Sequence, residues 1–205
     1  MAGSTGITIA LPDEEGLEIS LSGPLSQEEF EQFCRNNPDL QAEREPNGKI
    51  WIMPPVNLDS GYHEGEVFAE LRNFSKKDGR GRAFSPSTGF FLPDGSTRSA
   101  DASWVSWEKL NQLTPQQRKT FPPLVPDFII EVRSQSDSLP QLQRKMKDVW
   151  MANGVQLAWL IDPKEEKTYI YRADGSEEVI VGFDQQLNGE AVLPGFLLDL
   201  SLLEM

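Results

Sequence analysis

The fold is decided by residues 127–162, which read DFIIEVRSQSDSLPQLQRKMKDVWMANGVQLAWLID. An apolar, β-rich run over 127–133 is followed by a segment with helical spacing over 139–153, which Asn153-Gly154 closes. A second apolar run over 155–162 predicts another strand. Because a strand, a long helical crossover and a second strand form a parallel pair, this stretch predicts an α/β fold.

The residues before this unit predict two helices and further strands. Ser26 and Glu29 have the spacing of a capping box, which predicts a short docking helix. Residues 40–53 predict a hairpin around Asn47-Gly48, because this pair suits a tight turn with positive φ. Apolar residues at helical spacing predict an amphipathic helix over 61–74. Short strands are expected over 83–85, 89–92 and 99–106.

The remaining segments complete the predicted sheet. Residues 107–126 carry several prolines and predict a helical excursion on the surface, and strands are expected over 168–172 and 178–181. The apolar tail over 193–205 is expected to pack on the body. We therefore predict an α/β fold in which a central mixed sheet is flanked by helices. Residues 1–25 are predicted to be a loosely ordered arm, and residues 26–205 a single domain.

Composition excludes several classes of protein. The chain has 205 residues, a net charge of −13, one histidine and one cysteine. The charge argues against a nonspecific nucleic-acid coating protein, although a bound divalent cation can reverse the sign locally. Cys34 alone can build neither an internal disulfide nor a thiolate zinc site. With no apolar run near the length of a membrane span, we expect a cytoplasmic protein that does not bind membranes.

Chemistry by carboxylates remains after this elimination. His63 alone excludes a two-histidine zinc motif. Asp101 is expected inside the strand over 99–106, and Glu131 lies between apolar residues in the first strand of the crossover unit. A carboxylate in such a place is costly unless it is paired or binds a metal. The structural alternative is an ion pair between Glu131 and Arg133 on the same face of the strand.

The crossover helix offers a lysine to these acids. At 100° per residue, Leu142, Met146, Val149 and Trp150 form a buried stripe about 100° wide. Lys145 falls on the border of the stripe, where its ammonium could reach the carboxylates of the sheet, and Lys147 faces away. A solubilising role for Lys145 fits the spacing equally well.

A basic loop follows the helix over 61–74. Lys76, Lys77, Arg80 and Arg82 are four basic residues within seven positions. A solvated loop is the more common meaning of such a run, and a phosphate-binding loop is the functional one.

Several motifs in order resemble a known family. These are RSADASWV over 98–105, PDFIIEVRS over 126–134, Lys145-Met146, and NGVQLAWLIDP over 153–163. They resemble the Uma-type family, a domain of unknown function grouped with restriction endonucleases in the PD-(D/E)XK nuclease superfamily. The resemblance runs from about residue 40 to residue 172. It implies a restriction-endonuclease-like core and a nuclease site that uses a divalent metal, although most members have no assigned biological role.

Carried over by position, the resemblance implies specific site residues. Asp101 and Glu131 correspond to the metal-binding acids, with the Val132 carbonyl as a further ligand, and Lys145 corresponds to a catalytic lysine that has moved to the helix. Arg133 stands where the superfamily pattern places that lysine, but arginine cannot accept a proton. Glu43 and Glu64 resemble additional acids of such sites.

Two departures from the family pattern bear on this assignment. Ala100 replaces the proline of the motif. The segment from Lys145 to Gly154 is also one residue longer than the pattern, which leaves Lys147 as a substitute for Lys145.

The function implied is a DNA endonuclease that depends on Mg²⁺ or Mn²⁺ and hydrolyses phosphodiester bonds. DNA is then the partner, and a homodimer is expected because two strands need two sites. The alternative is a noncatalytic interaction module that keeps the nuclease-like fold while its acids form structural ion pairs.

Overall fold

The computed structural model describes residues 18–19 and 24–204. Most of the predicted arm over residues 1–25 therefore lies outside the described residues. Of the arm, residues 18–19 are described as β1 (Glu18–Ile19), which pairs antiparallel with β3 (Ile50–Met53).

A mixed six-stranded sheet forms the centre of the molecule, and this confirms the predicted fold class. Its strand order is β11-β10-β9-β8-β7-β4. Only β8 and β9 run parallel within it, and the crossover predicted from 127–162 connects these two strands. The strands are β4 (Gly81–Phe84), β7 (Ala102–Ser106), β8 (Phe128–Val132), β9 (Leu157–Asp162), β10 (Lys167–Arg172) and β11 (Glu177–Val181).

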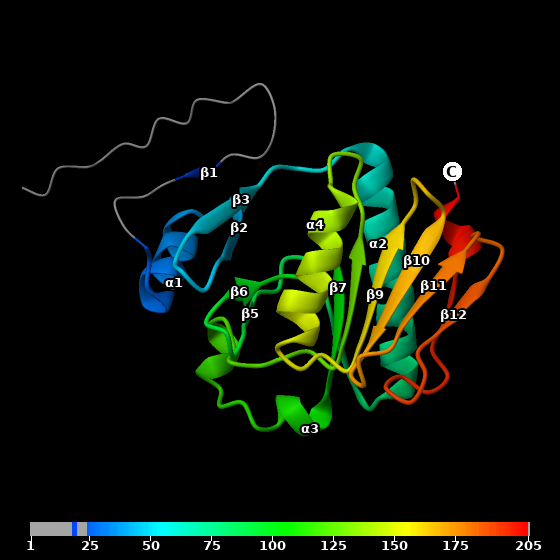
Figure 1. Cartoon of the computed structure of the whole chain (residues 1–205). Helices are drawn as coiled ribbons and strands as arrows, with labels where there is room; N and C mark the ends of the chain where they lie inside the picture. The colour runs from blue at the N-terminus through cyan, green and yellow to red at the C-terminus, as the bar shows by residue number, and fades with distance from the viewer. Residues whose placement is uncertain (1–17, 20–23, 205) are drawn as a thin grey trace, which may run out of the picture.

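Helices cover both faces of this sheet, as Figure 1 shows. On one face, Val67 and Leu71 of α2 (Leu58–Asp78) pack against Phe128 and Trp159. The C-terminal elements β12 (Gln186–Asn188), β13 (Leu197–Asp199) and η3 (Leu200–Leu203) add to that core. The other face is covered by the crossover, α4 (Leu139–Arg144) and η2 (Lys145–Met151), through Met146 and Trp150.

A second, five-stranded sheet lies beside the crossover helix, in the order β1-β3-β2-β6-β5. The predicted hairpin is present as β2 (Gln41–Arg44) and β3, with Gly48 at φ 85° in its turn. The capping box of Ser26 also begins a helix as predicted, α1 (Gln27–Asn36). The expectation that residues 89–92 extend the central sheet is wrong, because β5 (Phe90–Phe91) and β6 (Thr97–Arg98) join the second sheet through Arg44.

Two further expectations need correction. Asp101 lies just before β7 and not inside it. The crossover is not one α-helix: after Arg144 it continues as the π-helix η2. Only short pieces, α3 (Trp107–Leu110) and η1 (Gln117–Lys119), form helix in the predicted surface excursion. Among the described residues, no helix has the length and apolar character needed to cross a membrane.

Candidate active site

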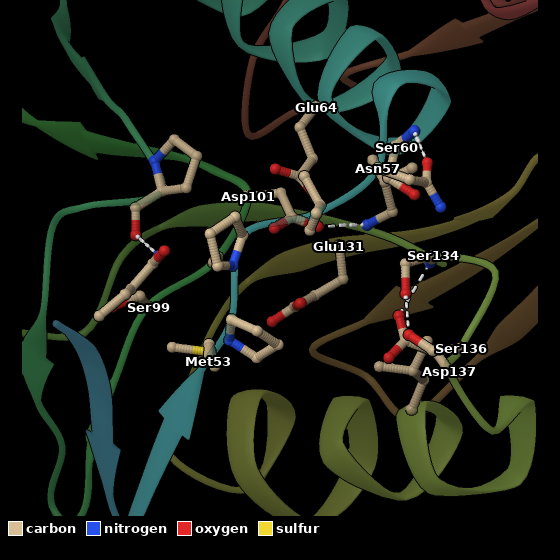
Figure 2. A pocket seen from close by; sticks show the side chains of 18 of the residues that line it. Met53, Asn57, Ser60, Glu64, Ser99, Asp101, Glu131, Ser134, Ser136 and Asp137 are labelled. Atoms are coloured by element: carbon tan, nitrogen blue, oxygen red, sulfur yellow. Dashed lines mark hydrogen bonds between the residues drawn. The ribbon is translucent and has the colours of Figure 1, made fainter. Parts of the chain in front are cut away.

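A cavity of about 270 Å³ opens where the two sheets, α2 and α4 meet. Figure 2 shows three carboxylates directed into it, from Glu64 on α2, Asp101 before β7 and Glu131 on β8. The segment Met53-Pro54-Pro55-Val56, which leads from β3 into α2, forms an apolar wall. Asn57 caps α2 by accepting a hydrogen bond from the Ser60 amide, which fixes the start of the helix at the cavity.

Asp101 is anchored to the end of the neighbouring strand. Its Oδ2 accepts a 2.6 Å hydrogen bond from the Val132 amide, so its carboxylate lies where β8 ends. Burial raises the pKa of Asp101 well above its ordinary value, and the nearby charge of Glu131 adds to this effect. The fold therefore holds Asp101 in a place where its negative charge is poorly compensated.

Glu131 is 5% exposed and receives two donors on one oxygen. Its Oε1 accepts a 2.7 Å hydrogen bond from the indole N–H of Trp150 and lies 3.0 Å from Lys145 Nζ. The pKa of Glu131 is nevertheless raised, because burial and the charge of Glu43 outweigh Lys145. The contacts with Trp150 and Lys145 therefore offset only part of the free-energy cost of burying the Glu131 carboxylate.

Lys145 lies between two acids that are far apart in the sequence. Its Nζ is 3.0 Å from Glu131 Oε1 and 3.4 Å from Glu43 Oε1. Burial by itself lowers the pKa of a lysine, but these two carboxylates raise the pKa of Lys145 above its ordinary value. Lys145 is therefore an ammonium group in this arrangement.

Glu43 supports the site from β2 behind Lys145. Its two oxygens are bonded by the Ser99 amide at 2.9 Å and by Arg98 at 3.1 Å. Although burial raises its pKa, Lys145 and Arg98 outweigh burial, and the pKa of Glu43 is lowered. Glu43 thus carries a stable negative charge that holds Lys145 in place.

Glu64 has no such compensation. Burial raises its pKa, and repulsion from Asp137 and Glu131 raises it further. Glu64, Asp101, Glu131 and Asp137 all line the cavity, whereas Lys145 is the single cation among the described residues of its lining. The cavity therefore contains more negative charge than its own residues neutralise.

The π-helix η2 explains how Lys145 and Trp150 reach the same oxygen. The two residues are five positions apart, which in an α-helix separates them by about 140°. In a π-helix the hydrogen bonds run between residues five apart, as from the Ala152 amide to the Lys147 carbonyl at 3.0 Å. The extra residue in each turn brings Lys145 and Trp150 toward one face. The one-residue excess between Lys145 and Gly154 coincides with this π-helix.

The structure places Arg133 and Lys147 away from the three acids. Arg133 pairs with Asp162 at 2.7 Å, so the expected alternative, a pair between Glu131 and Arg133, is wrong. Lys147 pairs with Glu177 of β11 at 2.8 Å, on the exposed surface. Val132 lines the cavity at the end of β8. Its amide donates to Asp101, and its carbonyl belongs to the same end of the strand.

The basic loop lies at the other end of α2. Lys76 follows Glu64 by twelve residues, which is about 18 Å along a helix. Arg80 pairs with Asp78, and the guanidinium of Arg82 lies 4.8 Å from the centre of the Trp107 ring. The structure thus does not bring Lys76, Lys77, Arg80 or Arg82 to the acids.

The donor set of the cavity fits a hard divalent cation. Carboxylate and carbonyl oxygens are the ligands of Mg²⁺, which keeps several waters and needs only one or two carboxylates. No group of three or more histidine, cysteine or acidic residues in the described part of the chain is gathered closely enough to hold a metal alone. A cation here would therefore rely on Asp101, Glu131, the Val132 carbonyl and water.

The sequence did not reveal two parts of this site. The sequence predicts that Trp150 lies on the buried stripe of the crossover helix. It does not predict that the indole N–H donates to Glu131, because that contact depends on the π-helix. Asp137 and Ser134 come from the loop between β8 and α4, where the Ser134 amide donates a 2.8 Å hydrogen bond to Asp137 Oδ2. The unusual segment length was the one signal that could have pointed to Trp150.

Comparison with known proteins supports the resemblance. The model of a family named Uma2, described as "Putative restriction endonuclease", matches residues 27–201. A crystal structure of a protein from Anabaena variabilis ATCC 29413, described as "a putative nuclease belonging to DUF820", superposes with a TM-score of 0.70. It is 22% identical, and the match covers 88% of this chain and 97% of that one, which confirms the fold. No curated protein matches the sequence significantly.

Proposed function

The chain belongs to the Uma2 family, and we propose that it is a divalent-metal-dependent endonuclease that hydrolyses phosphodiester bonds in DNA. The observation that carries the proposal is the convergence of Asp101, Glu131 and Lys145 on one cavity with an excess of negative charge. Structural ion pairs alone do not account for this excess, because the pKa values of Asp101, Glu131 and Glu64 are all raised.

Asp101, Glu131 and the Val132 carbonyl would hold Mg²⁺ or Mn²⁺. Both contacts of Glu131 named above fall on Oε1, so Oε2 is the oxygen that a cation would take. When bound, such a cation polarises a phosphate and acidifies a water molecule. Glu64 extends into the same cavity and would orient a water molecule there through its carboxylate.

Lys145 acts in this proposal as a fixed positive charge. Its raised pKa keeps the proton on Nζ, so it donates hydrogen bonds to oxygens on which negative charge develops. Charge stabilisation fits the contacts of Lys145 with Glu43 and Glu131 better than removal of a proton from water.

DNA would approach the cavity against the net charge of −13, and the basic loop would help from a distance. Lys76 and Lys77, near the end of α2 and about 18 Å along the helix from Glu64, would contact backbone phosphates roughly five base pairs away. A homodimer would supply a second site for the second strand.

A cleavage assay tests the proposal. Purified protein is incubated with supercoiled plasmid and with a labelled oligonucleotide in Mg²⁺, Mn²⁺ or EDTA, together with Glu131→Gln and Asp101→Asn proteins prepared in parallel. We expect cleavage by the wild type in Mn²⁺ or Mg²⁺ that EDTA stops and both substitutions abolish. Equal cleavage by all three proteins would identify a contaminating nuclease. Intact DNA in every reaction, with no Mn²⁺ binding by calorimetry, would favour the noncatalytic module.

A further inference from the structure

A second cavity lies on the molecule, at the edge of the central sheet where β4 and α3 meet. Its volume is about 410 Å³. We call it the arginine–aromatic cavity, because its lining includes Arg82, Phe84, Phe90, Trp107, Arg118 and Phe121. The acids of the candidate active site do not line it.

Aromatic rings build the walls of the arginine–aromatic cavity. Phe84 and Phe90 meet edge to face with their centres 6.1 Å apart. Phe121 is held by stacking on Phe30 of α1 at 5.5 Å. A Cβ atom at Gly89 would lie 2.7 Å from the ring of Phe121, so only glycine lets this ring approach the backbone as it does. The wall is therefore built by specific packing and not by a gap between loops.

The charge of this cavity is opposite to that of the whole chain. In the part of the chain that the structure describes, its charged lining residues are Arg82 and Arg118, with no carboxylate. Arg82 is held over the Trp107 ring at 4.8 Å, and Arg118 donates from NH2 to the Leu110 carbonyl at 2.6 Å. A guanidinium group has five N–H donors, so the single contact of Arg118 with Leu110 leaves it able to bind an anion as well.

Aromatic walls with two guanidinium groups select a planar ring that carries an anionic group. A nucleotide combines these features, because its base stacks on aromatic side chains and its phosphate accepts two parallel hydrogen bonds from arginine. The volume also falls within the range of cavities that hold small molecules, about 300–1,000 Å³.

A third hollow lies between the arginine–aromatic cavity and the candidate active site. That hollow shares Gln41 and Ser99 with the candidate active site. It shares Ser87, Gly89 and Phe121 with the arginine–aromatic cavity. Residues 86–89 therefore lie between the two sites, as Pro86 lines the active-site cavity and Gly89 the other.

We propose that the arginine–aromatic cavity is a nucleotide subsite that takes one unpaired base and its phosphate from the substrate strand. This inference rests on the proposed nuclease function and specifies its substrate. A base that stays paired cannot enter such a cavity, so a single strand or a flap would fill it more readily than a duplex, from which the nucleotide must first be flipped out.

Binding of labelled DNA in EDTA, where no metal-dependent cleavage occurs, tests the subsite separately from catalysis. Fluorescein-labelled single-stranded and duplex oligonucleotides of equal length are titrated with wild type, Arg118→Ala and Lys119→Ala, and binding is followed by anisotropy. Lys119 is the matched control, since it is exposed, adjacent and outside the lining. We expect Arg118→Ala to weaken single-strand binding about tenfold, Arg118→Lys to restore it in part, and Lys119→Ala to change it less than twofold.

Three outcomes would overturn the subsite. They are equal losses in Arg118→Ala and Lys119→Ala, a preference for duplex over single strand, and binding of free dAMP as tight as that of the oligonucleotide. The last result would assign the cavity to a free nucleotide instead of a strand. Cleavage by the wild type separates the two proposals: single-strand binding that depends on Arg118, without any cleavage, would leave a strand-binding subsite standing and remove the nuclease. If Arg118→Ala leaves both cleavage and single-strand binding unchanged, the nuclease stands and the subsite is removed.

Discussion

The indole N–H of Trp150 donates a 2.7 Å hydrogen bond to Oε1 of Glu131, the oxygen that Lys145 Nζ also approaches. Trp150 is fully buried, and the bond joins the π-helix η2 to the central strand β8. Trp150 and Lys145 together orient the Glu131 carboxylate through this one oxygen. Trp150 is thus a positioning residue for the proposed metal ligand.

Replacing Trp150 by phenylalanine should destabilise the protein by more than the lost ring volume. A hydrogen bond to a charged group contributes roughly 1.5–3 kcal/mol, and its loss leaves Glu131 buried with one donor fewer. Trp159→Phe is the matched control, because Trp159 is equally buried and its indole nitrogen has no hydrogen-bond partner among the described residues. Urea unfolding measures both. Equal losses of stability would show that the bond to Glu131 contributes nothing.

The two lysines of η2 should differ sharply in activity. Lys145→Ala removes the ammonium between Glu43 and Glu131, and we expect a fall in kcat of about 10²–10³. Lys147→Ala removes an exposed pair with Glu177 and a contact with the Tyr171 ring, both away from the cavity, and we expect less than a twofold change. Single-turnover cleavage of a labelled strand compares them. A larger fall in kcat for Lys147→Ala than for Lys145→Ala would assign the catalytic role to Lys147, and it would contradict the role given to Lys145 from its contacts in the cavity.

Asp101→Asn should stabilise the metal-free protein while removing its response to metal. Because the pKa of Asp101 is raised in the fold, its charged form costs stability above its ordinary pKa of 3.8. We expect a Tm higher by a few degrees at pH 7, since about 1 kcal/mol corresponds to roughly 2–4 °C in a domain of this size. The difference from the wild type should shrink as the pH falls from 7 toward 4, where protonation neutralises the wild-type carboxyl.

Thermal melts with and without Mn²⁺ measure this effect. The wild type should gain stability from Mn²⁺, and Asp101→Asn should not. Asp148→Asn, at an exposed position of η2, is the control for removing one negative charge. A lower Tm for metal-free Asp101→Asn, together with an unchanged Mn²⁺ response, would contradict the idea that Asp101 is held for a cation.

Cys34 should react slowly with alkylating reagents in the folded protein. Burial raises the pKa of its thiol from 9.0 to about 11, and Glu31 adds to the effect. Because the thiolate is the reacting form, alkylation by iodoacetamide at pH 8 should be about 100-fold slower than in denaturant, and it should rise about tenfold per pH unit. Mass spectrometry follows the reaction. Similar rates in the folded and unfolded protein would show that Cys34 is not shielded.

The hairpin and the α1 capping box could be predicted because each depends on neighbours within a few residues, and the crossover unit because two apolar runs flank one helical segment. The capping box of Ser26 and Glu29 and the turn at Asn47-Gly48 are local hydrogen-bonding patterns. The second sheet could not be predicted, because a single residue pair, Arg44 and Thr97, joins its hairpin to β6. No periodicity in residues 89–98 indicates which sheet they join.

The sequence by itself determined the order of strands and helices around Glu131, and together with the family resemblance it predicted Asp101, Glu131 and Lys145 as site residues. Tertiary structure alone decided how these side chains pair: Glu43, 102 residues away, binds Lys145, Asp162 takes Arg133, and Trp150 reaches Glu131. The physical reason is that spacing fixes a side chain's direction only while the helical geometry stays regular. A turn of π-helix changes that direction, and partners from other strands then set the charge and the hydrogen bonds of the site.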